Sequence, residues 1–195
     1  MRTPKFVNAL AYSPVIVNID FITQCLKKNE LLDAEDFALV DQEAEERFSF
    51  SLKEAAAKAA KNKNKLLQGY NIYCVDSIRG GFDAFKSIVD ANGGQCLLFR
   101  GRVSHKVQQP DSDSENDSDN ANSNEKPHDK EVYLLSSVGP EHQRLWPRFR
   151  QMVQEIGKTP RIVRVDWLLD TAMSQELHAA DEYELNEDVV DKDED

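Results

Sequence analysis

The chain has 195 residues, with 24 Lys and Arg against 35 Asp and Glu, and a formal net charge of −11. That length allows one or two domains with a buried core. It holds no run of about 20 apolar residues that could span a membrane, and we expect no secretory leader. Three widely spaced cysteines and four histidines without ligand spacing predict a reducing compartment, with neither a disulfide framework nor a metal site.

Most of the negative charge lies in two segments. Residues 111–130 hold seven acids and two lysines, and residues 181–195 hold nine acids and one lysine. The rest of the chain carries 21 basic and 19 acidic residues, a net charge of +2. Because both segments are poor in apolar residues, we expect them not to fold. The near-neutral body is a poor candidate for general DNA binding, which needs concentrated Lys and Arg.

A helix is predicted at the start of the chain, over RTPKFVNALA. Thr3 and Pro4 are typical of a helix start, because Thr caps a free amide and Pro has no N–H to leave unpaired. Lys5 lies in the first turn, where free amides and the helix dipole favour an anion such as a phosphate. Arg2 has the planar fork that fits a carboxylate. These residues predict an anion site, although a lysine in a first turn also commonly points to solvent.

An internal repeat aligns SPVIVNIDFI, residues 13–22, with TPRIVRVDWL, residues 159–168, at an offset of 146 residues. In each copy a Pro ends a helix, a β-branched run predicts a buried strand, and an Asp is placed to cap the next helix. The aromatic residue after each Asp begins the apolar stripe of that helix, so we expect it in the core. The residues concerned are Pro14, Val15, Ile16, Val17, Asp20 and Phe21, and Pro160, Ile162, Val163, Asp166 and Trp167.

Between the two copies lies FSFSLKEAAAKAAKNKNK, residues 48–65. Ser51 and Glu54 form a capping box before an alanine-rich helix, which we expect to fix the angle between the repeats. The lysines at positions 58, 61, 63 and 65 are typical of a solvated helix end, and a nuclear import patch is the alternative.

Strands and helices alternate along the second half of the chain. Strands are predicted at residues 69–75, 95–99 and 131–137, and a helix begins at Phe82 and stops at Gly93 and Gly94. Cys25 and Cys96 lie among apolar residues and are predicted to be small core side chains. The alternation predicts an α/β domain with a parallel sheet flanked by helices.

Together these segments resemble the tandem BRCT repeats, phosphoprotein-binding modules of DNA damage response proteins. The resemblance is carried by IVNIDF, IVRVDW, the NGG at residues 92–94, RTPKFVNALA and DQEAEERFSFSL. The last two segments are most similar to the C-terminal BRCT pair of fungal DNA-damage scaffolds of the regulator of Ty transposition type. They are also similar to the mediator of DNA damage checkpoint protein of animals.

The resemblance implies four parts. Residues 1–40 are the C-terminal half of a first repeat that lacks its opening strands, and residues 41–67 are a linker with a helix. Residues 68–185 are the second repeat, with a disordered acidic insertion at about 108–130, and residues 186–195 are an acidic tail. In the family, the first strand supplies a Ser or Thr hydroxyl and a Gly amide to the phosphate. This chain is therefore either a fragment of a longer scaffold or has an incomplete pocket.

The resemblance also implies a function, that of a non-enzymatic nuclear scaffold. In related repeats the lysine matching Lys5 holds the phosphate, and the arginine matching Arg2 holds the terminal carboxylate of a C-terminal phosphoserine tail. Thr3 helps through its cap. The implied ligand is the damage-phosphorylated tail of histone 2A, and the other implied partners are DNA repair and replication-fork proteins. We expect no cofactor, no membrane contact and no sequence-specific binding to nucleic acid.

Two other classes of function stay open. One is a phosphate-independent protein assembly domain, and the other is an accessory domain of a larger DNA repair enzyme whose catalytic groups lie elsewhere. Ser112 and Ser114 each precede an acid by three residues, which fits an acid-directed kinase; a passive solubilising loop is the alternative.

Overall fold

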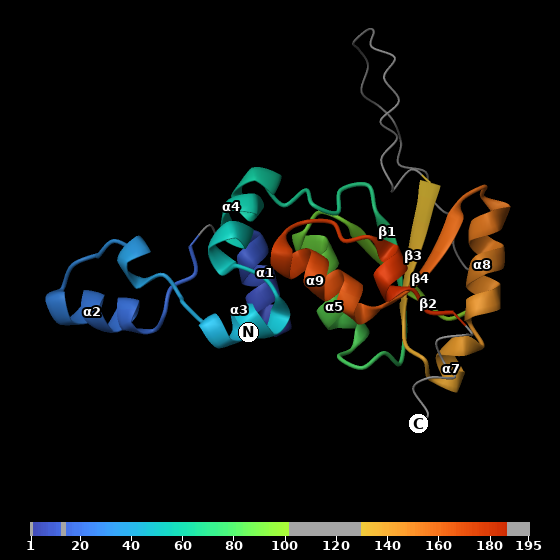
Figure 1. The fold of residues 1–195 in the computed structure, drawn as a ribbon, viewed down its shortest axis with the longest axis horizontal. Helices are drawn as coiled ribbons and strands as arrows, with labels where there is room; N and C mark the ends of the chain where they lie inside the picture. The colour runs from blue at the N-terminus through green and yellow to red at the C-terminus, as the bar shows by residue number, and fades with distance from the viewer. Residues whose placement is uncertain (1, 13–14, 102–129, 187–195) are drawn as a thin grey trace, which may run out of the picture.

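The structure is a computed structural model that describes residues 2–12, 15–101 and 130–186. One parallel sheet has the strand order β2-β1-β3-β4, with β1 at Asn71–Val75, β2 at Gln95–Phe99, β3 at Glu131–Ser136 and β4 at Thr159–Arg164. In Figure 1, α5 (Phe82–Ala91) and α9 (Val165–Ser174) lie on one side of the sheet, and α8 (Trp146–Glu155) lies on the other with the short α7 (Pro140–Gln143). The predicted α/β fold with a small parallel sheet is confirmed.

The core lies between the sheet and its helices. Trp146, Phe149 and Trp167 are fully buried. The Trp167 ring stacks on Tyr133 of β3, with 4.4 Å between centroids, so its predicted place in the core is confirmed. Cys96 is buried as predicted. Cys25 is only half-buried, so the prediction of a core position for this thiol was too strong.

The described residues before the sheet form the α-helices α1 (Pro4–Tyr12), α2 (Asp20–Lys28), α3 (Gln42–Phe48) and α4 (Leu52–Asn62). Val7 on α1 is part of the main core, and Leu10 packs with Leu52 and Ala55 of α4. The Ser51 hydroxyl accepts a hydrogen bond from the Glu54 amide at 3.4 Å, which confirms the predicted cap of α4. Because α4 contacts both α1 and α9, it joins the two repeats.

A chain of side-chain amides, from half-buried Asn62 to buried Gln175 and Asn92, holds the linker against the second repeat. The side chain of Asn62, at the end of α4, donates to the backbone carbonyl of Gln175 at 2.9 Å. The Gln175 side chain then donates to Asn92, also at 2.9 Å. Gln175 and Asn92 are both buried, so each bond replaces one that water would otherwise make.

The internal repeat is structural as well as sequential. Both α2 and α9 end at a residue in the left-handed conformation, Asn29 in one copy and Gln175 in the other, 146 positions apart. A 3-10 turn follows in each copy, η1 at Glu35–Phe37 and η2 at Ala180–Tyr183. The order of helix, left-handed residue and 3-10 turn is therefore the same in the two copies.

In both copies, the segment after the 3-10 turn forms a backbone hydrogen bond with the extended segment that precedes the helix. In the first, the Leu39 amide donates to the Ile16 carbonyl at 2.7 Å. In the second, the Leu185 amide donates to the Ile162 carbonyl at 2.7 Å. Both partners again differ by the offset of 146, which extends the repeat well beyond the ten residues that align in sequence. Residues 181–185 are folded onto the second repeat, so the expectation that residues 181–195 do not fold was wrong for this part of the segment.

Three predictions for the repeat were wrong. Phe21 is only half-buried and belongs to neither described core cluster, because α2 has no buried residue. Val15, Ile16 and Val17 are half-buried and form only one bridge, from Val17 to Ala38, because the described residues place no other strand beside them. Asp20 and Asp166 do not cap their helices through the side chain. Each lies inside the first turn instead of before it, and Asp166 is occupied by an ion pair.

Candidate functional site: a cleft between the repeats

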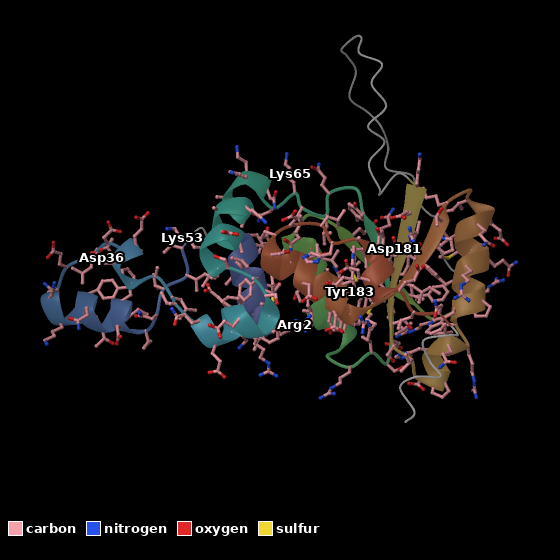
Figure 2. All side chains as sticks on the ribbon, viewed as in Figure 1. Arg2, Asp36, Lys53, Lys65, Asp181 and Tyr183 are labelled. Atoms are coloured by element: carbon pink, nitrogen blue, oxygen red, sulfur yellow. The ribbon has the colours of Figure 1, made fainter. Side chains whose placement is uncertain are left out.

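A cleft of about 420 Å³ lies where the start of α1, the linker helix α3 and helix α9 meet. Figure 2 labels two of its residues, Arg2 and Tyr183, which come from opposite ends of the chain. The cleft is lined by three arginines, two aspartates and a mixture of aromatic and small polar side chains: Arg2, Arg47, Phe48, Ser49, Phe50, Arg164, Asp166, Asp170, Met173, Ser174, His178 and Tyr183.

Arg2 is fixed in the cleft by carboxylates of the second repeat. Its Nη1 donates to Asp166 at 2.9 Å and its Nη2 to Asp170 at 2.6 Å. These aspartates are four residues apart on α9, so they share one helix face. The guanidinium also lies over the Phe48 ring, 5.4 Å from its centroid. Its buried Nε has no hydrogen-bond partner in the described structure.

Thr3 and Lys5 lie at the start of α1, beside the cleft and not in its lining. The Thr3 hydroxyl accepts a hydrogen bond from the Phe6 amide at 3.3 Å, as predicted for the cap. Lys5 is exposed in the first turn, where the helix dipole favours an anion. The structure thus places the three predicted residues on one short segment, with only Arg2 inside the cleft.

Sequence reasoning missed the residues that hold Asp170 in place. The Tyr183 hydroxyl donates to Asp170 at 3.0 Å. Burial, together with this hydrogen bond, raises the pKa of Tyr183 to about 12, so the phenol stays a donor at neutral pH. His178 extends the network, with its ring nitrogens 3.3 Å from Tyr183 and 3.0 Å from Ser174.

A sequence signal existed for only part of this network. The spacing of Asp166 and Asp170 predicts a shared helix face, but nothing local connects that face to Arg2, which is 168 positions from Asp170. Arg47 lies in the linker segment that carried the resemblance, yet its place on the cleft depends on how α3 packs.

The part of the chain that the structure describes contains no helix long and apolar enough to cross a membrane. The same residues contain no group of three or more His, Cys, Asp or Glu that could hold a metal.

Comparison with known proteins gives consistent matches. Residues 1–39 match the family described as "Regulator of Ty1 transposition protein 107 BRCT domain". The chain is 28% identical to BRCT-containing protein 1 of Schizosaccharomyces pombe over 186 residues, which is 93% of this chain and 19% of that protein. It is 32% identical to human Mediator of DNA damage checkpoint protein 1 over 108 residues, 55% of this chain and 5% of that protein. The chain thus spans a fifth or less of these relatives.

Solved structures agree with the sequence matches. The S. pombe Brc1 BRCT5-BRCT6 domains superimpose with a TM-score of 0.68 at 25% identity, covering 97% of this chain and 80% of that one. The complex of Rtt107p with phosphorylated histone 2A shares the fold at a TM-score of 0.56 and 15% identity, covering 95% and 72%. Residues 1–39 therefore match a BRCT family model, and the described chain has the fold of a tandem BRCT pair.

Proposed function

We propose that this chain is the phosphopeptide-binding part of a nuclear DNA-damage scaffold, which binds a C-terminal phosphoserine tail and holds repair and replication-fork proteins on chromatin without catalysing a reaction. The observation that carries the proposal is the cationic first turn of α1 beside a cleft between two repeats. The tail of phosphorylated histone 2A is the ligand we favour, because the Rtt107p structure with the same fold holds that partner.

Lys5 and Thr3 are the proposed phosphate-binding residues. A phosphate carries a charge near −2 and prefers charge-assisted donors. Exposed Lys5 provides an ammonium group with no carboxylate partner among the described residues. Thr3 fixes the helix start, and so the position of the free amides around it.

Arg2 is the proposed site for the terminal carboxylate of the ligand. Its two Nη groups are already oriented by Asp166 and Asp170. A ligand carboxylate would therefore bind a guanidinium group whose position is fixed, and not a flexible surface side chain. Because these aspartates belong to α9, the site requires both repeats to be packed together.

The experiment measures binding of fluorescent peptides in which about two to four residues separate a phosphoserine from the free C-terminus, a length that spans neighbouring sites in extended form. An unphosphorylated peptide and a C-terminally amidated phosphopeptide serve as comparisons. Lys5→Ala is expected to weaken binding of the phosphopeptide about tenfold or more, the effect of losing one charge-assisted contact. Lys53→Ala, an exposed lysine on α4 (Figure 2), is the matched control and is expected to bind normally.

The same assay tests Arg2. Arg2→Gln is expected to remove the preference for the free acid over the amide, whereas Arg148→Gln on α8, across the sheet, is expected to keep it. Thermal melts of each variant show whether the repeats stay packed. Equal affinity of the unchanged protein for phosphorylated and unphosphorylated peptides would overturn the proposal.

An exposed apolar surface favours the second candidate, a phosphate-independent assembly domain. Ile19, Ile22, Leu26 and Leu31, on and around α2, are between 54% and 83% exposed. Light scattering that shows self-association, combined with peptide binding that phosphatase does not change, is the result that would support this candidate in place of the first.

A further inference from the structure

Two of the three cleft arginines have no carboxylate partner among the described residues. Arg47 on α3 is exposed and stacks over Phe48 at 5.4 Å. Arg164, at the end of β4, is exposed, lies 5.9 Å from the centroid of the Tyr183 ring, and donates only to a backbone carbonyl, that of Glu182 at 3.2 Å. Both guanidinium groups are therefore held on aromatic rings with their charge unpaired.

The charges of the cleft do not cancel. Its lining contains only two carboxylates, Asp166 and Asp170, and both are bound to Arg2. Arg47 and Arg164 leave the lining with a net charge of +1 when His178 is neutral. Because the aromatic side chains Phe48 and Tyr183 form part of the wall, the field of these two arginines is screened less than it would be on an open surface.

The two arginines come from different parts of the module. Arg47 belongs to the linker, and Arg164 belongs to the last strand of the second repeat. Arg2, the proposed site of the terminal carboxylate, lines the same cleft. A tail that ends at Arg2 would therefore place the side chains of its last residues within a cavity that carries two more planar, bidentate donors.

We propose that Arg47 and Arg164 bind an acidic side chain of the tail, one that lies between the phosphoserine and the terminal carboxylate. The module would then select phosphorylated tails that also carry Glu or Asp. This inference rests on the proposed function and adds a determinant of specificity to it.

The experiment compares pairs of phosphopeptides with free C-termini that differ only in having Glu or Gln at one position after the phosphoserine. Each position is tested in turn. The unchanged chain is expected to prefer the Glu peptide by at least fivefold at one position. The ratio is expected to fall to near one in the double variant Arg47→Gln, Arg164→Gln, and the preference to weaken as salt rises.

Arg148→Gln on α8 is the matched control, since it removes one exposed arginine on the other side of the sheet and is expected to leave the ratio unchanged. The ratio of the affinities of one protein for the two peptides is insensitive to partial unfolding, because unfolding lowers both affinities by the same factor. An unchanged ratio in the double variant, or no preference in the unchanged chain, would overturn this inference alone. Binding that ignores phosphorylation would remove the proposed function and this inference with it.

Discussion

Cys74 and Cys96 show how burial sets the chemistry of single residues in the sheet. Cys74 lies on β1 and Cys96 on the neighbouring β2, and both are buried in the main core. Burial, followed by nearby negative groups, raises the pKa of each thiol to about 12. Because the thiolate is the reactive form, these two cysteines are expected to be inert in the folded protein.

The raised pKa of these thiols predicts a loss of stability at alkaline pH. An unfolded thiol has a pKa of about 8.5, so the folded state holds its protons more tightly, and this contribution is fully present below that pH. It is lost as the pH rises toward 12. In urea titrations, the free energy of unfolding is expected to be smaller at pH 10.5 than at pH 7.5.

The double variant Cys74→Ala, Cys96→Ala separates the contribution of the thiols from that of Tyr183, whose pKa burial also raises to about 12. Its free energy of unfolding is expected to fall less steeply with pH than that of the unchanged chain. Parallel pH curves for the two proteins would contradict the prediction.

Secondary-structure elements were predictable where each carried its own local signal. The strand around Cys74 is predictable from its alternating pattern, the strands around Cys96 and Leu134 from short apolar runs, and the end of α5 from two glycines. Val15–Val17 carries the same strand signal, but a strand also needs neighbours, and the described structure gives it one bridge. The ion pairs of Arg2 were not predictable, because they depend on how distant helices pack.

Gly93 tests how closely elements approach at the end of α5. Its φ is +82°, and a Cβ there would lie 2.3 Å from the carbonyl oxygen of Asn64 in the linker. Gly93→Ala is therefore expected to combine backbone strain with a clash that only backbone movement relieves, and to lower the free energy of unfolding by about 2–4 kcal/mol. Urea unfolding measures the change.

Gly157 is the matched control for Gly93. Its φ is +72°, but a Cβ there would meet nothing within 4 Å. Gly157→Ala is expected to cost only the strain of the left-handed backbone, about 1 kcal/mol. Equal losses for the two variants would show that the approach of the linker to α5 adds nothing to stability.

Across the whole molecule, stability is expected to be divided unevenly between the two repeats. The second repeat contains the sheet and most of the buried side chains. Helix α2 has no buried residue and lies apart from the sheet in Figure 1. Its aromatic residue, Phe21, makes an edge contact with Phe37 of the adjacent turn η1. The matched residue of the second copy, Trp167, is fully buried.

Amide hydrogen exchange measures this division directly. Amides of β1 and β3 are expected to exchange only on global unfolding, with protection of about 10⁴-fold or more for a domain of ordinary stability. Amides of α2 are expected to open locally, with protection of about 100-fold or less. Adding a phosphopeptide with a free C-terminus should slow exchange in α1 and α3, which border the cleft, and leave α2 unchanged. If α2 instead exchanged as slowly as β1 at every protein concentration, its apolar side chains would have to be covered within the chain, contrary to their exposure in the structure.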